Sequence, residues 1–267
     1  MNAPLALMYH AVCPLSARWD LLERALVVDP RVFARQIERL AAMGWRTLSL
    51  AEYASALDGR PVDRRFLLTF DDAYEGLDDF VSPVLRRHGY TAVVFAPWAH
   101  LGTPNSWDVD HPALCRLRVM SAADLHSLGA GPWEVASHGC RHVDLRAMDP
   151  EARRRELEVS KESLSELTGR PVDALAYPFG YADSGVRRDA ADAGFKLGFV
   201  ATPYPAGGRL GLPRRAITDL DRGPLLRLRT ARRPWLYQLE DGARRPLRLR
   251  RLWPRSRSDR RNTGRRP

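Results

Sequence analysis

The sequence predicts an α/β fold in which helices cover a mostly parallel sheet that is either open or closed into a barrel. Short runs of apolar, β-branched and aromatic residues, each of strand length, alternate with segments of helical periodicity. This alternation favours parallel pairing, because each helix returns the chain to the starting edge of the sheet. Hydrophobic residues make up 45% of the 267 residues, which is enough for a sizeable core.

Eight segments have the length and composition of buried or half-buried strands. In chain order the expected strands are Leu5–Val12, Thr47–Leu50, Phe66–Phe70, Thr91–Ala96, Trp133–Ser137, Ala174–Tyr177, Leu197–Ala201 and Pro213–Thr218. No repeated unit relates them to one another.

Helix start and stop signals separate these strands. Asp29 at the N-cap, Pro30 at the first position and Gly44 after the end predict a helix over Pro30–Met43. The other expected helices cover Ala51–Leu57, a segment ending near His88, Ser121–Leu128, Asp149–Thr168 and Ser184–Ala193. The segment Pro97–Met120 is irregular, and a loop of that length in a compact domain is usually functional.

The net charge of +10 is concentrated at the C-terminal end. Residues 222–267 hold 16 arginines and three acidic residues, a net +13, which leaves −3 for residues 1–221. We therefore expect a folded domain over 1–221 that carries the activity, and an Arg-rich tail over 222–267 that is partly disordered. No specific nucleic-acid partner is expected. For the tail, peripheral contact with an anionic membrane, binding of nucleic acid and plain disorder stay open.

Cysteine usage and hydropathy indicate the compartment. Cys13, Cys115 and Cys140 are odd in number and lack C-x-x-C spacing, which is a poor disulfide framework and fits a reducing compartment. The apolar stretch Leu5–Val12 is too short for a signal peptide, and no run of 18 apolar residues is present. A cytoplasmic location, or one peripheral to the inner membrane surface, is the expectation.

Polar residues follow several of the expected strands. Asp71 and Asp72 end one strand, His138 ends another, residues 177–180 end a third, and His10 lies near the end of the first. In parallel α/β folds ligands bind at the carboxyl ends of the strands. These side chains are therefore expected to meet at one mouth.

Two histidines four positions apart, His138 and His142, can share one metal ion, and histidine with carboxylate suits zinc. A catalytic zinc normally has three protein ligands, and Asp72 is the candidate for the third. Asp71 would then be the general base for a water whose pKa the metal lowers. Taken singly, an H-x-x-x-H pair is more often on the surface and an Asp-Asp pair more often a solvated cap. Cys140 is an alternative third ligand, but it would crowd the metal and leave the aspartates unexplained.

These segments resemble motifs of the polysaccharide deacetylase (NodB-homology) family of carbohydrate esterases. Residues 69–72 are similar to its T-F-D-D motif, 137–142 to S-H-x-x-x-H, and 176–180 to the Y-P-Y-G form of its third motif. Residues 7–10 resemble the M-Y-H opening of bacterial exopolysaccharide N-deacetylases. Residues 105–108 and 212–214 extend the similarity to about residues 5–220. The resemblance implies a distorted (β/α) barrel with fewer than eight units, Asp71 as base, and Asp72, His138 and His142 as ligands of a divalent metal, with Zn²⁺ the first choice.

Two departures from the family pattern change the expected roles. Ala176 stands where many members carry an arginine that orients the base, and no histidine after His142 supplies the late general acid. In the subgroup that opens with M-Y-H, the early histidine takes the acid role, so the resemblance assigns His10 as acid and Arg214 as the substitute partner of Asp71. A core histidine and a surface ion pair are the alternatives for these two residues.

Aromatic residues of the mouth segments complete the expected site. The backbone N–H of Phe179 is the candidate oxyanion donor, since Pro178 has none. Tyr177, Phe179 and Trp107 are expected substrate contacts, because aromatic faces stack on sugar rings, although such residues more often belong to a core.

The combination implies a metal-dependent hydrolase that removes acetyl groups from an N-acetylated poly- or oligosaccharide or lipid-linked glycan. Two alternatives remain: an amidase acting on another non-peptide C–N bond, for which Ala176 leaves room, and a non-catalytic carbohydrate-binding relative. The paired base and metal set weighs against the last, since binding alone needs neither. The sugar, the polymer length and the oligomeric state stay open.

Overall fold

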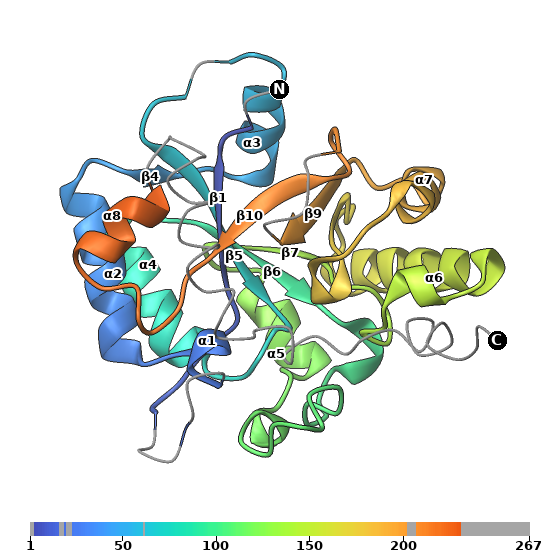
Figure 1. The fold of residues 1–267 in the computed structure, drawn as a ribbon, viewed down its shortest axis with the longest axis horizontal. Coiled ribbons are helices and arrows are strands. Elements are labelled where there is room, and N and C mark those ends of the chain that lie inside the picture. The colour runs from blue at the N-terminus through green and yellow to red at the C-terminus, as the bar shows by residue number, and fades with distance from the viewer. Residues whose placement is uncertain (1–2, 16–18, 20–22, 61, 202–206, 231–267) are drawn as a thin grey trace, which may run out of the picture.

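Seven parallel strands hydrogen-bond in a closed ring (Figure 1). The computed structural model describes residues 3–15, 19, 23–60, 62–201 and 207–230. Around the ring the strands are β1 (Leu5–Tyr9), β5 (Arg65–Asp71), β6 (Ala92–Ala96), β7 (Trp133–Ser137), β8 (Ala174–Ala176), β9 (Leu197–Ala201) and β10 (Leu212–Ala216). Strand β1 pairs with β5 on one side and with β10 on the other, which closes the barrel. The expected (β/α) barrel of fewer than eight units is confirmed.

Three short strands lie beside this ring. Strand β4 (Arg46–Thr47) pairs with the start of β5, while β2 (Ala11–Val12) and β3 (Val27–Val28) form a separate two-stranded parallel sheet. The expected first strand is therefore interrupted at His10, where the chain leaves the barrel. The expected strand Thr47–Leu50 is also shorter than predicted, because Ser49 forms a capping box with Glu52 and starts the next helix.

Helices surround the barrel (Figure 1). They are α1 (Glu23–Leu26), α2 (Pro30–Ala42), α3 (Leu50–Leu57), α4 (Ser82–His88), α5 (Ala122–Leu128), α6 (Pro150–Thr168), α7 (Ser184–Asp192) and α8 (Pro224–Thr230). A π-helical turn, Leu77–Val81, precedes α4, and short 3₁₀ turns occur at Trp98–His100, Leu114–Arg116, Leu145–Ala147 and Pro178–Gly180. The predicted caps are present at α2 and α6, where Asp29 and Asp149 accept backbone N–H bonds.

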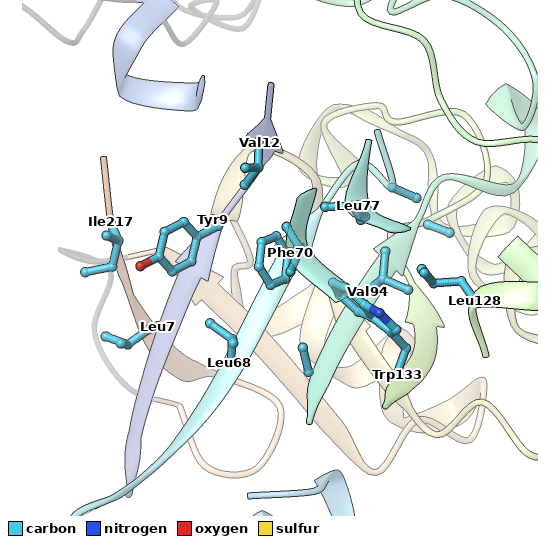
Figure 2. Close-up of a cluster of buried hydrophobic side chains, with 14 of the residues drawn as sticks. Leu7, Tyr9, Val12, Leu68, Phe70, Leu77, Val94, Leu128, Trp133 and Ile217 are labelled. Atoms are coloured by element: carbon cyan, nitrogen blue, oxygen red, sulfur yellow. The ribbon is translucent and has the colours of Figure 1, made fainter. Parts of the chain in front are cut away.

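Alternation along the strands divides the core into two layers. On β5, Leu67 packs inside the barrel with Phe95 and Phe199. Leu68 and Phe70 of the same strand face outward, where they pack under the helices (Figure 2). The same alternation puts Asp71 on the inner side, at the carboxyl end of the strand. The strand thus delivers one carboxylate to the barrel mouth.

The described structure continues beyond the expected domain boundary at residue 221. Helix α8 lies beside α2 (Figure 1), its Leu226 is buried, and Arg229 donates from Nε to Asp221 at 3.0 Å. Part of the Leu-Arg segment that reads as a tail in the sequence is here a helix, with Leu226 and Arg229 buried against the rest of the fold. The calls on residues 231–267 lie outside the described residues. Within the described part, no helix is both long and apolar enough to cross a membrane.

Candidate active site

Two consecutive aspartates, Asp71 and Asp72, lie at the end of β5 and contact different side chains. Asp71 is the last strand residue, whereas Asp72 and Ala73 have positive φ values of 69° and 48°. In a regular strand, Asp71 and Asp72 would point to opposite faces. The left-handed turn instead aims both carboxylates into the mouth, and both are buried.

Asp72 meets the two histidines that follow β7. Its Oδ1 lies 3.4 Å from Nε2 of His138 and 3.2 Å from Nε2 of His142. One ligand atom from each of the three residues lies within 4.8 Å of the others, and all three residues are buried. Among the residues described, they are the group of histidine, cysteine and carboxylate side chains spaced to hold a metal ion.

Hydrogen bonding prepares these atoms for a cation. Nδ1 of His138 lies 2.8 Å from the carbonyl oxygen of Ala176, so Nδ1 carries a proton and Nε2 is the nitrogen that faces Asp72 and could bind a metal. Oδ1 of Asp72 is buried and accepts no well-directed hydrogen bond. A buried carboxylate oxygen without a donor is costly unless a cation compensates it. Two imidazole nitrogens and one carboxylate oxygen fit a divalent metal such as zinc.

Burial and the neighbouring charges shift the pKa values of Asp72 and the two histidines in different directions. Burial raises the pKa of Asp72, but the imidazoles of His142 and His138 hold that pKa well below its usual value. Burial lowers the pKa of His142 below its ordinary value. At His138 burial also acts to lower the pKa, but the carboxylates of Asp71 and Asp72 raise it above the usual range.

Arg214 on β10 forms a two-pronged ion pair with Asp71. Nη1 donates to Oδ1 at 2.6 Å and Nη2 donates to Oδ2 at 2.7 Å, and the arginine is fully buried. Burial raises the pKa of Asp71, but the guanidinium of Arg214 and the imidazole of His138 lower it below its usual value. The structure therefore brings the guanidinium of Arg214 to Asp71, the expected base. Only β9 separates its strand from β8, where Ala176 stands in place of the expected motif arginine.

His10 lies at the same mouth, where the chain passes from β1 to β2. Strand alternation puts it on the side of Ala6 and Met8, toward the barrel axis. After the larger effects of Arg214 and His138, the imidazole of His10 also acts to lower the pKa of Asp71. It acts in the same direction, weakly, on the pKa of Asp108, which burial raises. His10 is half-buried. The structure brings His10 near the expected base; its role as acid stays a prediction.

The turn Pro178–Gly180 closes the mouth on the β8 side. Phe179 has a positive φ of 60°, and its ring packs edge-on against His142 at 4.7 Å between centroids. In the described part of the chain no hydrogen bond engages the backbone N–H of Phe179. This N–H is therefore not engaged within the described fold; its role as an oxyanion donor stays a prediction.

Tyr177 corrects one expectation. Its side chain is fully buried, its hydroxyl donates to the carbonyl of Leu210 at 2.9 Å, and its N–H donates to the carbonyl of Phe199. Both polar groups are thus engaged inside the fold, and Tyr177 offers no surface to a substrate. The prediction of Tyr177 as a substrate contact is wrong; the residue is part of the core.

Trp107 lies over His142, one of the three candidate metal ligands. Its ring stacks on His142 at 4.4 Å and 27°, and His100 packs against its edge at 4.9 Å. Half-buried, the indole keeps part of its surface open. The long loop expected to be functional thus supplies a wall directly beside the histidines.

The model of the polysaccharide deacetylase family matches residues 58–198, which is more than half of the chain. The chain belongs to the polysaccharide deacetylase family. Family membership confirms the resemblance inferred from the motifs and the expectation of a hydrolase that acts on amide C–N bonds.

Similar proteins with names come from several bacteria. The polysaccharide deacetylase-type protein YxkH of Bacillus subtilis (strain 168) is 23% identical over 77% of this chain and 67% of its own length. The poly-beta-1,6-N-acetyl-D-glucosamine N-deacetylase of Staphylococcus epidermidis is 26% identical over 74% of this chain and 72% of its own. The fold matches the Streptococcus pyogenes deacetylase PplD with a TM-score of 0.71 at 22% identity, over 85% of this chain and 98% of PplD. The fold also matches IcaB from Ammonifex degensii, with a TM-score of 0.69 at 21% sequence identity, over 86% of this chain and 98% of IcaB.

Sequence reasoning missed the hydrogen-bond network that supports Trp107. Nδ2 of Asn105 donates to the Tyr74 hydroxyl and to Oδ2 of Asp108, each at 2.7 Å, and Oδ1 of Asn105 accepts the backbone N–H of Trp107. Burial, followed by the charges of Asp72 and Asp108, raises the pKa of Tyr74 well above its usual value. The position of Tyr74, two residues after Asp72, was the signal available in the sequence.

Proposed function

We propose that this protein hydrolyses the acetamide of an N-acetylated sugar in a glycan, releasing acetate, with a divalent metal held by Asp72, His138 and His142. The proposal rests mainly on one observation, the position of Asp71 beside the three candidate ligands. A buried carboxylate, Asp71, is oriented by Arg214 and lies beside three side chains whose ligand atoms converge.

Asp71 is suited to the role of general base. Arg214 keeps it ionised and fixes its plane, while Oδ2 lies 4.0 Å from Nε2 of His138 and so borders the ligand cluster. Each oxygen accepts one bond from the guanidinium and retains a lone pair for a proton. When bound, a divalent cation would polarise the acetamide carbonyl and make a water molecule acidic near neutral pH.

Residues of the mouth can accept the proton of the water, stabilise the negative oxygen and protonate the leaving nitrogen. As the water oxygen attacks the carbonyl carbon, Asp71 takes its proton and the carbonyl oxygen becomes negative. The N–H of Phe179 is the donor available to that oxygen. His10 then gives a proton to the sugar nitrogen as the C–N bond breaks, leaving acetate and a free amine.

The structure weakens support for the two alternatives. The amidase hypothesis rests on Ala176, but Arg214 supplies the guanidinium that Ala176 cannot, so the base is fully partnered. A binding-only relative would need neither this buried ion pair nor three converging ligands. The curated relative named for poly-beta-1,6-N-acetyl-D-glucosamine supports a sugar substrate, and zinc is our choice of metal because two imidazoles and a carboxylate suit it.

The test is acetate release from N-acetylglucosamine oligomers by zinc-loaded protein. Asp71→Asn should retain bound metal and lose at least about 100-fold in kcat, because the base no longer accepts a proton. His142→Ala should lose metal and activity together. A wild-type protein that binds zinc stoichiometrically yet releases no acetate from any N-acetylated oligosaccharide would contradict the proposal.

A further inference from the structure

Glu156 lies in the middle of α6, and its side chain is only 1% exposed. A glutamate is rarely buried to this degree unless its carboxylate is paired, because removing the charge from water is costly. Glu162, farther along the same helix, is exposed. Helix formation alone therefore does not account for the burial of Glu156.

The Glu156 carboxylate binds the loop between the two metal-ligating histidines. Its Oε1 accepts the backbone N–H of Cys140 at 2.9 Å and also the backbone N–H of Arg141. Its Oε2 accepts Nε of Arg141 at 2.9 Å. Three donors thus surround one buried carboxylate, and two of them are main-chain groups of the segment from His138 to His142.

Other parts of the fold hold the rest of this loop. The N–H of His138 donates to the carbonyl of Ala96, and the N–H of Gly139 donates to Oγ of Ser137. The carbonyls of residues 139 and 140 accept the N–H groups of residues 98 and 99. Among the described residues, Glu156 is the acceptor that completes this set for the two amides just before His142.

His142 itself depends on that support. Its φ of 49° is a left-handed value, uncommon for residues other than glycine, and such a conformation persists when the surrounding structure holds it. The two amides that precede it are fixed by Glu156, so the carboxylate sets the course of the chain into this strained residue. Loss of these bonds would let the loop relax toward an ordinary backbone conformation and separate the two imidazoles.

We infer that Glu156 is a positioning residue for the metal site: by accepting the amides of Cys140 and Arg141, it fixes the spacing of His138 and His142. The inference rests on the proposed metal-dependent function. It concerns affinity for the metal and leaves the acid and base roles unchanged.

The experiment measures the zinc dissociation constant of the full chain by competition with a chromophoric chelator. Glu156→Ala removes all three acceptor bonds and should weaken zinc binding about 10- to 100-fold, the usual effect of losing an outer support of a metal ligand. Glu156→Gln keeps an oxygen that can accept both amides, but its NH₂ group cannot accept a hydrogen bond from Nε of Arg141. Its zinc affinity should therefore lie between those of Glu156→Ala and the wild type.

Two matched variants separate the contributions. Arg141→Ala keeps the backbone bonds to Glu156 and should bind zinc close to the wild-type level. Glu162→Ala removes an exposed carboxylate from the same helix and should change nothing. At saturating zinc, Glu156→Gln should recover most of the wild-type kcat, because the ligands themselves are intact.

Melting curves with and without zinc distinguish positioning from general stability. A positioning role predicts that Glu156→Ala shrinks the zinc-induced rise in Tm. Wild-type zinc affinity in Glu156→Ala and Glu156→Gln, with Tm lowered equally in both conditions, would show Glu156 to be merely structural and overturn the inference. Failure of the wild type to bind zinc or any other divalent metal would instead refute the proposed function.

Discussion

Side chains at the mouth are aimed by backbone conformations that are unusual for their residue types. Of the five described non-glycine residues with positive φ, Asp72, Ala73, His142 and Phe179 lie in the three loops of the site. Each such residue costs about 1–3 kcal/mol unless its surroundings over-determine it. Two of the three candidate metal ligands are thus held in strained positions by the loops that carry them.

Arg214→Met tests the partner of the base. Burial alone raises the pKa of Asp71, and the guanidinium lowers it, so removing the guanidinium should raise this pKa. A base is active when deprotonated, so the acid limb of the kcat/KM profile should move to higher pH. Circular dichroism must first show that the variant folds, because the unpaired buried carboxylate costs about 3–5 kcal/mol. An unmoved acid limb in a folded variant would remove Asp71 from the role of titrating base.

His10→Ala tests the acid. An acetamide leaves as an amine that needs a proton, whereas an activated ester leaves without one. The variant should therefore lose about 10²–10⁴-fold in kcat on N-acetylglucosamine oligomers and far less on an activated acetate ester. Zinc content should not change. Equal losses on both substrates would make His10 a structural residue.

At the scale of elements, the turn after β8 depends on a glycine. A Cβ on Gly180 would lie 2.4 Å from Cβ of Ala201 and 2.8 Å from its N, and the residue has a φ of 74°. The turn therefore packs directly on β9, and this approach places the Phe179 backbone at the mouth. A side chain at residue 180 would push the turn away from the strand.

Gly180→Ala should lower the free energy of unfolding by about 2 kcal/mol or more, because it adds a backbone clash to an unfavourable φ. Gly169→Ala is the matched control: its φ is 64°, but no atom lies within 4 Å of the added carbon, so only the backbone penalty of about 1 kcal/mol applies. Urea denaturation of both variants measures the difference. Similar losses for the two substitutions would show that the turn can move away from β9 at no cost.

At the scale of the whole molecule, closure of the ring brings the two ends of the described chain together. Strand β1 lies between β5 and β10, so His10, Asp71 and Arg214 reach the same mouth although 204 positions separate the first from the last. Helix α8 follows β10 and packs near α2, where Gln36 donates to the carbonyls of Thr218 and Asp221. Residues 222–230 thus pack as part of the folded body.

Truncation tests this extension. A chain ending at residue 221 loses the buried Leu226 side chain, worth about 1.5–3 kcal/mol, and leaves Asp221 without Arg229. It should melt several degrees below a chain ending at residue 230, by about 2–4 °C for each kcal/mol lost at this size. Equal melting temperatures would place the boundary of the stable domain at 221, as the charge distribution alone suggests.

Local pattern was sufficient to predict much of this protein. Strand and helix order follow from apolar periodicity and caps, which depend on neighbouring residues. The three motifs follow from residue types at fixed spacing, and family membership agrees with them. Because parallel strands share a direction, the sequence also determined that Asp71, His138 and Phe179 would lie at one end of the sheet.

Only the tertiary structure decided which distant side chains meet. The Arg214–Asp71 pair requires β10 and β5 to flank β1, and the capture of the Cys140 and Arg141 amides by Glu156 requires α6 to pack under the β7 loop. Tyr177 reads as a mouth aromatic in the sequence, but the tertiary packing buries it against Leu210. A residue's burial and partners depend on elements remote in the chain, so local spacing could propose these side chains but could not assign their contacts.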